Sequence, residues 1–152
     1  MPHSLTDLVV HVIFSTKERR PFLDDGLRPR LSVFAYIKAI VQEHGARLHN
    51  INGSKDHLHL LLPLSTTVTL ADLMRNVKGS SSHWIHQEFP DRRTFAWQDG
   101  FAAFSVSHLR LKQVYDYIAR QPEHHKKLTF RDELLALLNK HEIAYDEKNL
   151  RT

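Results

Sequence analysis

The sequence predicts an α+β fold in which a central antiparallel sheet carries helices on one face. The first observation is a β-hairpin signal, because two apolar segments at 46–52 and 56–62 flank a Gly53-Ser54 turn. The second is a run at 8–16 that is rich in β-branched and aromatic residues, as strands are. The third is the helical spacing of apolar residues in several of the remaining segments.

The first strand and first helix follow from the N-terminal third of the chain. Because side chains alternate along a strand, Val10, Val12 and Phe14 are expected on one face of the 8–16 strand and His11 on the other. A helix is expected over about 24–44, where apolar residues recur at helical spacing and a glycine follows as a stop.

The second half of the chain predicts three helices and two short strands. A helix over about 70–88 begins after Thr69, which with Asp72 resembles a capping box, and Gly79 weakens its middle enough to allow a break. The other predicted elements are strands at 94–97 and 101–106 and helices at about 107–121 and 129–140. Together these elements form a single domain over residues 1–152.

Composition sets limits on the class of protein. Charged residues make up 25% and hydrophobic residues 41%, which is ordinary for a soluble globular protein, and the net charge of +4 suits a polyanionic partner without identifying one. The absence of cysteine excludes disulfides and thiolate metal sites. No apolar run is long enough to span a bilayer and no signal-peptide pattern is present, so we expect a cytoplasmic protein without membrane contact.

The segment DHLHLLLP at 56–63 is the strongest candidate for a functional site. In a strand, His57 and His59 point to the same face, where two imidazoles can close on one divalent cation. The intervening leucines point to the opposite face and predict a core there. The histidine face is expected to be wet and metal-binding, although a solvated pair on an edge strand is the simpler alternative.

A second group of functional side chains is expected on the helix around Tyr117. Gln113, Tyr117 and Gln121 are spaced four residues apart and form one polar stripe, in which the phenol is a candidate nucleophile near a phosphate. The Gln121 carbonyl oxygen is a candidate third metal ligand, and oxygen and imidazole ligands favour Mg²⁺ or Mn²⁺. Pro122 disfavours helical geometry at Gln121, and Tyr115 faces elsewhere and is expected to be structural.

Four stretches carry a family resemblance and together span most of the chain. They are HVIFSTKERRPFL (11–23), DHLHLLL (56–62), FAWQDGFAAFSVS (95–107) and YIARQPEHHKKLTFRDE (117–133). In this order they resemble the single-tyrosine HUH transposases of small insertion sequences and of repetitive-palindrome elements. The histidine triplet alone is a weak signal, whereas the triplet followed by YIxxQ, HHKK and TFxDE is specific.

The resemblance implies a ferredoxin-like sheet with helices packed on it, and a metal-dependent enzyme that cuts and rejoins single-stranded DNA with subterminal hairpins. It implies that His57, His59 and Gln121 hold Mg²⁺ or Mn²⁺. It also implies that Tyr117 forms a 5′-phosphotyrosine link and frees a 3′-hydroxyl. Members of this family often act as homodimers in which the tyrosine helix docks against the partner's histidine pair.

A set of basic and histidine side chains is predicted to contact DNA phosphates, which would make binding salt-dependent. The set is Lys17, Arg19, Arg20, Arg75, Lys78, His124, His125 and Lys126. Taken singly, each of the first five is better explained as an ordinary solvated charge, and His124 and His125 could instead complement a helix C-terminus. Phe95, Trp84 and Trp97 could stack on unpaired bases, but core packing is expected for at least two of them. His11 is expected to be a satisfied histidine of the sheet.

Two other functions compete with the transposase hypothesis. A non-catalytic or domesticated module that binds nucleic-acid hairpins would use the same fold without cutting. A phosphohydrolase of the histidine-triad type would need a third alternating histidine, and position 61 is Leu. The sequence therefore favours a transposase over a hydrolase, and hairpin binding without cleavage stays open.

Overall fold

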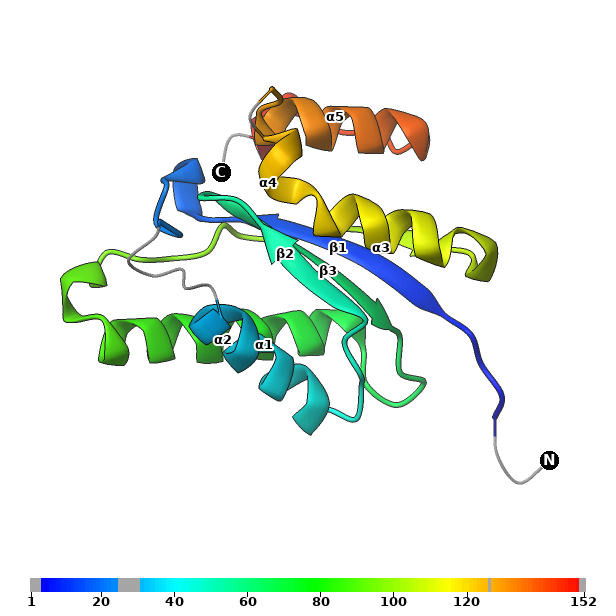
Figure 1. Ribbon diagram of the computed structural model, residues 1–152, viewed down its shortest axis with the longest axis horizontal. Helices are drawn as coiled ribbons and strands as arrows, with labels where there is room; N and C mark the ends of the chain where they lie inside the picture. The colour runs from blue at the N-terminus through cyan, green and yellow to red at the C-terminus, as the bar shows by residue number, and fades with distance from the viewer. Residues whose placement is uncertain (1–3, 25–30, 126, 151–152) are drawn as a thin grey trace.

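The computed structural model describes residues 4–24, 31–125 and 127–150. Four strands and five α-helices follow one another in chain order (Figure 1). They are β1 (Val9–Ser15), α1 (Leu31–Glu43), β2 (Asn50–Gly53), β3 (His57–Pro63), α2 (Leu70–Glu88), β4 (Ala102–Val106), α3 (Leu111–Ala119), α4 (Gln121–His124) and α5 (Phe130–Lys140). Short 3₁₀ turns lie at Lys17–Arg19, Pro90–Arg92, His108–Arg110 and Glu147–Leu150.

The sheet confirms the predicted antiparallel architecture. Its strand order is β2-β3-β1-β4, and each adjacent pair is antiparallel. With α1 and α2 as crossovers, this order is the ferredoxin-like arrangement that the resemblance implies. The register places His59 opposite Ile13 and His57 opposite Ser15, so both histidines lie on a central strand with a neighbour on each side. An exposed edge-strand pair is therefore excluded.

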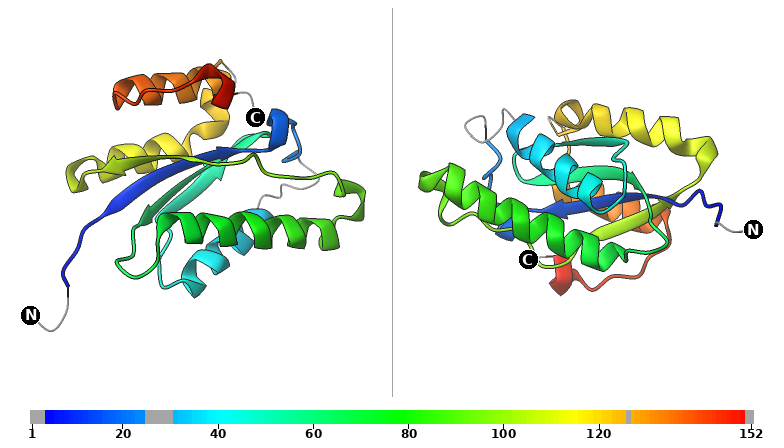
Figure 2. Two further views of the ribbon diagram at one scale, coloured as in Figure 1. Left: turned by 180° about the vertical axis from the view of Figure 1, so that it is seen from behind. Right: turned by 90° about the horizontal axis from the view of Figure 1, so that it is seen from below.

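Helices cover both faces of the sheet, so the prediction that they lie on one face is wrong. Helices α1 and α2 lie against one face, and α3, α4 and α5 lie against the other (Figures 1 and 2). The reason is visible in the strands themselves, because β1 and β3 are buried along nearly their whole length and need cover on both sides.

The larger core lies between the sheet and the pair α1–α2, and it confirms the alternation predicted for the strands. Its strand residues are Val12, Phe14, Leu58, Leu60 and Leu62, all fully buried. The helices contribute a longer apolar set: Val33, Ile37, Ile40, Val41, Leu73, Met74, Val77 and Ile85. Phe95 and Trp97 belong to the same core, which confirms the packing role expected for two of the three aromatic residues.

A smaller apolar layer fixes the three C-terminal helices on the opposite face. Phe130 and Leu134 of α5 pack with Ile13 and Phe104 of the sheet. Ile118 of α3 packs with three other buried side chains, Val9, Leu61 and Val106. These contacts roof the face of β3 that carries the histidines.

Helix α2 matches the predicted bounds and runs without a break. The Thr69 hydroxyl accepts a hydrogen bond from the Asp72 backbone N–H, which confirms the expected cap. Past Gly79, Ser81 is buried and donates its hydroxyl proton to the Val77 carbonyl. That hydroxyl also accepts a hydrogen bond from Trp97 Nε1 at 2.9 Å, which ties the weak stretch to the core.

Several predicted boundaries differ from the structure. Segment 94–97 is not a strand, and only Trp97 forms a bridge, with Thr16. The hairpin strand predicted from 46 begins at Asn50, and the helix predicted over 107–121 is divided into a 3₁₀ turn, α3 and α4. The start of the predicted 24–44 helix falls partly on 25–30, outside the described residues. None of the described helices is long and apolar enough to cross a bilayer.

Candidate active site

Strand β3 places His57 and His59 side by side, but the face they share is not wet as the sequence predicted. Both side chains are fully buried. The Phe130 ring stacks on the His57 ring with the ring centroids 4.7 Å apart. The Tyr117 and His59 rings are in edge contact, with their centroids 6.0 Å apart. The burial follows from the C-terminal helices α3, α4 and α5, which cover this face of the sheet, whereas the sequence predicted two helices here and placed all helices on one face.

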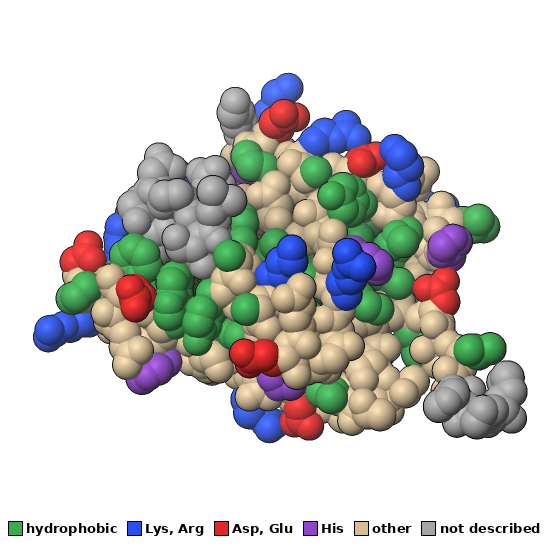
Figure 3. All heavy atoms as spheres, turned by 60° about the horizontal axis from the view of Figure 1, so that its bottom comes forward, with side chains coloured by type: hydrophobic (Ala, Val, Ile, Leu, Met, Phe, Trp, Pro, Cys, Tyr) green, Lys and Arg blue, Asp and Glu red, His purple; other side chains and the backbone are tan. Residues whose placement is uncertain are grey.

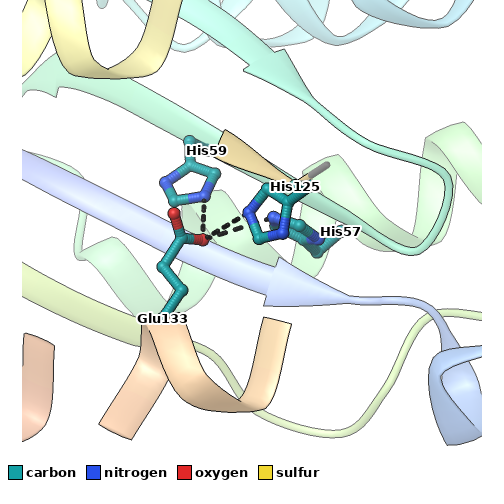
Figure 4. Close-up of side chains that lie close together, drawn as sticks. All are labelled: His57, His59, His125 and Glu133. Atoms are coloured by element: carbon teal, nitrogen blue, oxygen red, sulfur yellow. Dashed lines mark hydrogen bonds and ion pairs between the residues drawn. The ribbon is translucent and has the colours of Figure 1, made fainter. Parts of the chain in front are cut away.

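Glu133 of α5 is the centre of the site, although the sequence pattern did not predict a role for it. Its Oε1 lies 2.8 Å from His59 Nε2, 3.3 Å from His57 Nε2 and 3.1 Å from His125 Nε2 (Figure 4). The side chain is 3% exposed. The available signal was the stretch TFRDE, in which Thr129 caps α5 through the Asp132 N–H and so fixes the first turn that carries Glu133.

The second oxygen of Glu133 faces the predicted nucleophile. The Tyr117 hydroxyl donates a hydrogen bond to Glu133 Oε2, and Gln121 Nε2 donates another at 3.0 Å. Gln121 is fully buried, and its Oε1 lies 3.4 Å from His57 Nε2. One carboxylate therefore joins the histidine pair to both residues that the sequence placed on the tyrosine helix.

A helix break, predicted from Pro122, turns Gln121 toward the histidines. Helix α3 ends at Ala119 with Arg120 as its C-cap, and Gln121 begins the short helix α4 with Pro122 in its first turn. The break separates Gln121 from the regular stripe expected with Tyr117 but keeps it beside His57. Gln121 thus starts a helix instead of ending one.

Strand β2 holds the tyrosine helix in place through two asparagines. Asn50 Nδ2 donates to the Tyr115 carbonyl and Asn52 Nδ2 donates to the Ala119 carbonyl, each at 3.1 Å. These contacts bracket Tyr117 along the helix. Tyr115 itself is 44% exposed and lies outside the cluster, as its structural role predicts.

Two further side chains orient the imidazoles. Asp56 Oδ1 lies 2.7 Å from His57 Nδ1, and His11 Nε2 lies 2.7 Å from His59 Nδ1. Such contacts to the far nitrogen fix the tautomer and the ring orientation of histidines that bind metals. His11 was expected to be a satisfied histidine of the sheet, and the structure shows that its partner is a site residue.

The site concentrates negative charge on Glu133. Burial alone would raise the pKa of this carboxyl, but hydrogen bonds from His125, His57 and His59 outweigh burial and hold the pKa far below its usual range. Burial opposes the charged form of His57, yet the contacts with Asp56 and Glu133 raise its pKa. Burial dominates at His59 and lowers its pKa to about 4.

The Tyr117 phenol stays protonated in this environment. Burial raises its pKa above the ordinary value, and the neighbouring Glu133 carboxylate raises it further. The hydroxyl proton is therefore held between Tyr117 Oη and Glu133 Oε2. A reaction that uses the phenol as a nucleophile must remove this proton.

The buried cluster has the chemistry of a metal site. His57, His59, His125 and Glu133 each offer one ligand atom, and these atoms all lie within 4.8 Å of one another. Three imidazoles and a carboxylate are ordinary ligands of divalent transition metals, and the carboxylate supplies the negative charge that a buried cation needs. His125 had been predicted as a phosphate contact and instead belongs to this cluster.

Among the described residues, none of the other predicted DNA contacts forms a hydrogen bond or ion pair with the cluster. Lys17 and Arg19 lie in the 3₁₀ turn that follows β1, and Arg20 is the residue that caps this turn. Arg20 forms an ion pair with Glu18. Arg75 lies on α2, on the opposite face of the sheet, where basic side chains are scattered among acidic ones (Figure 3). The His124 side chain and Lys126 lie outside the described residues.

The ammonium group of Lys78 is engaged by other groups of the protein. Its Nζ donates to the carbonyls of Gln98 and Gly100 and lies 5.4 Å from the centre of the Phe14 ring. Burial lowers its pKa to about 8. These contacts hold the turn before β4 against α2, so a phosphate would have to compete with two carbonyls for this ammonium group.

Comparison with known proteins identifies the family. The model of the IS200-like transposase family matches residues 4–121. The transposases of insertion sequence IS200 from Salmonella typhimurium and Salmonella typhi are each 24% identical over 131 residues, which cover 83% of this chain and 84% of each relative.

Two solved structures share the fold. A candidate transposase from Deinococcus radiodurans R1 has a TM-score of 0.62 and 24% identity, and the match covers 78% of this chain and 93% of that one. A REP-associated tyrosine transposase bound to a REP hairpin has a TM-score of 0.61 and 14% identity, covering 83% and 73%. With most of its length matched by the family model, the chain belongs to the IS200-like transposases.

Proposed function

We propose that this protein cleaves and rejoins single-stranded DNA at hairpin-bearing element ends through a covalent intermediate on Tyr117. The observation that carries the proposal is the Glu133 carboxylate, which contacts both histidines of β3 with one oxygen and the Tyr117 hydroxyl with the other. A nucleophile and a metal-binding pair thus meet within one chain. A similar structure, the REP-associated transposase, is bound to a DNA hairpin, which supports this substrate class.

His57 and His59 would hold a divalent cation, and Gln121, His125 and Glu133 are the candidates for the remaining protein ligands. A cation held by these residues would supply Lewis-acid chemistry, polarising the scissile phosphate and stabilising the leaving oxygen. Both Mg²⁺ and Mn²⁺ are expected from the family resemblance. The imidazole-rich set favours Mn²⁺, because Mg²⁺ prefers oxygen ligands almost exclusively.

The chain's own residues account for the transfer. The Tyr117 oxygen attacks the phosphorus and loses its proton, the bond from phosphorus to the 3′-oxygen breaks, and that oxygen gains a proton to become a free 3′-hydroxyl. Glu133 Oε2 fixes the position of the phenol proton before attack. Rejoining reverses these bond changes, so no external energy source is needed, in agreement with the lack of a glycine-rich phosphate loop.

Covalent trapping tests the proposal directly. Purified protein is mixed with single-stranded DNA that carries the hairpins flanking its own gene, with Mn²⁺ or Mg²⁺, and is run on a denaturing gel. We expect a slow protein–DNA band that requires metal and is lost in Tyr117→Phe and His57→Ala. Tyr115→Phe is the matched control and should retain the band, because Tyr115 lies outside the cluster.

A hairpin-binding module without cleavage is the second candidate function. The observation that favours it is the similar REP-associated transposase, which is bound to a REP hairpin, because binding of this kind does not itself require cleavage. Hairpin binding that persists while no adduct forms with any metal would establish this function. An adduct that survives Tyr117→Phe would show that another residue is the nucleophile.

A further inference from the structure

A cavity of about 650 Å³ opens beside Tyr117, between β4, α3 and α5. Its walls are mainly apolar, and its inner end reaches the site. The apolar part is formed by Phe104, Val106, Val114 and Leu137, and the inner end by His11, Tyr117 and Glu133. The cavity is within the size range of small-molecule sites and leads directly to the predicted nucleophile.

A second cavity of similar volume lies on the other side of the cluster. It is lined by Lys55, Asp56, His125, Lys127 and five further residues in the same region, Pro21, Ser54, Pro122, Thr129 and Phe130, and it shares Leu128 with the first cavity. The buried cluster is therefore flanked by two openings. Tyr117 lines only the first of them.

We propose that the cavity beside Tyr117 binds the nucleotide on the 3′ side of the cut, the one that stays attached to the enzyme. This inference rests on the proposed function. A 5′-phosphotyrosine link joins Tyr117 to the phosphate on the 5′-oxygen of that nucleotide. Only this phosphate group separates the phenol oxygen from the sugar, so the sugar and base must lie close to Tyr117. The cavity is the space next to the phenol that has room for them.

The lining of the cavity suits an unpaired nucleotide. The apolar walls at Phe104, Val114 and Leu137 offer contacts for a base, and such contacts do not depend on the base sequence. Arg110 and Lys140 are both exposed at its rim and complement the phosphates that continue the strand. A base inside the cavity cannot pair with a second strand, so this site selects single-stranded DNA.

The polarity of the strand follows from the same geometry. The nucleotide that leaves with the free 3′-hydroxyl extends from the opposite side of the cluster, toward Lys55 and Lys127. The scissile phosphate would then lie at the cluster itself. The effect of removing the base 3′ of the cut and the effect of removing the base 5′ of the cut on the rate of adduct formation should therefore depend on different protein residues.

A cycle of protein and DNA changes tests the assignment. Ala136 is exposed at the lining of the cavity, and Ala136→Trp places an indole there, whereas Ala71→Trp adds the same group to an exposed position of α2 on the opposite face. Adduct formation is measured with hairpin DNA that lacks one base either 3′ or 5′ of the cut. We expect Ala136→Trp to slow the reaction about tenfold, as loss of one base contact does.

The cycle supports the proposal if removal of the 3′ base slows the wild-type protein but has little further effect on Ala136→Trp. Additive losses, or coupling to the 5′ base instead, would overturn it. Ala71→Trp should behave as the wild type with every DNA. If the wild-type protein forms no adduct with intact DNA and either metal, the proposed cleavage fails, and a binding measurement then decides on the cavity.

That measurement follows backbone amide NMR signals during titration with a short oligothymidylate. Occupation of the cavity predicts shifts at Arg110, Val114 and Leu137 that are lost in Ala136→Trp and kept in Ala71→Trp. Shifts confined to the second cavity, at Lys55 and Lys127, would overturn the assignment even if the protein cleaves DNA.

Discussion

Glu133 is the residue on which the candidate site depends most. A buried carboxylate is stable in its charged form only when hydrogen bonds and opposite charges replace water. Here three imidazoles, an amide and a phenol do so. The side chain that a metal would need as an anionic ligand is thus also the one that contacts Tyr117, the proposed nucleophile.

Replacement of Glu133 by Gln should weaken metal binding. The variant keeps the size of the side chain and removes its charge, and we expect Mn²⁺ affinity to fall by about tenfold or more, as for altered metal-site shells. Isothermal titration calorimetry measures the affinity, and circular dichroism verifies the fold. Glu123→Gln is the control, because Glu123 is exposed on α4. Equal Mn²⁺ affinity in both variants would place Glu133 outside the coordination shell.

The buried His11–His59 pair predicts a loss of stability in acid. Burial lowers the pKa of His11 to about 3 and that of His59 to about 4, below the ordinary value of 6.5. Between pH 6.5 and these lowered pKa values, the two imidazoles are protonated in the unfolded chain but not in the folded chain. The free energy of unfolding should fall as the pH drops through this window, by on the order of 3 kcal/mol for His11 at pH 4.

Urea unfolding of the metal-free protein at pH 7, 5.5 and 4 measures this dependence. The raised pKa of His57 acts in the opposite direction near neutral pH, so the comparison uses the difference between wild type and His11→Phe. The free energy of unfolding should change less steeply with pH in the His11→Phe variant, because the phenyl ring does not titrate. Equal slopes would mean that His11 accepts a proton in the folded protein.

At the scale of elements, the turn between β2 and β3 is the tightest constraint on the site. A Cβ on Gly53 would lie 2.1 Å from the His57 carbonyl oxygen, which is backbone and cannot move aside cheaply. The chain at this point therefore fixes where β3 begins and where His57 stands. In contrast, a Cβ on Gly79 of α2 would meet nothing within 4 Å.

The two glycines form a matched pair for mutagenesis. Gly53→Ala should lower the melting temperature and reduce Mn²⁺ binding, because the start of β3 must shift. Gly79→Ala should raise stability by about 1 kcal/mol without changing metal binding, since alanine favours an exposed helix position. Differential scanning calorimetry with and without Mn²⁺ separates these effects. Unchanged Mn²⁺ binding in Gly53→Ala would show that the turn adapts.

The sequence predicted the parts of the site that depend on local spacing. The alternation in β3 places His57 and His59 together, and the short spacing of Tyr117 and Gln121 keeps both beside Glu133 although a helix break lies between them. Glu133 was not predicted as a site residue and His125 was predicted only as a phosphate contact, because their positions depend on how α4 and α5 pack across the sheet. Packing between elements has no fixed sequence period, which also explains why helices on both faces were missed.

At the scale of the whole molecule, the site is assembled within one chain. Tyr117 reaches the histidines through Glu133 of the same chain, whereas the family resemblance implies dimers in which the tyrosine helix docks on the partner. The homodimer stays a prediction, which light scattering tests against the chain mass of 17.7 kDa. Which subunit supplies Tyr117 to a given pair of histidines in the active form is a separate question with its own test.

Mixing two inactive variants answers that question. Tyr117→Phe and His57→Ala are incubated together under conditions that exchange subunits, and adduct formation is measured. Because each chain supplies both groups to its own site, the mixture should form no more adduct than either variant alone. Restored adduct formation would show that the tyrosine acts on the partner's histidines.

The site draws on segments that leave the ribosome at different times. Strand β3 and its histidines are synthesised well before α3, and α5 with Glu133 follows last among the elements of the site. A nascent chain that has folded its sheet still lacks the carboxylate that joins the histidines to the tyrosine. On this account, the order of synthesis delays assembly of the cluster until α5 has been made.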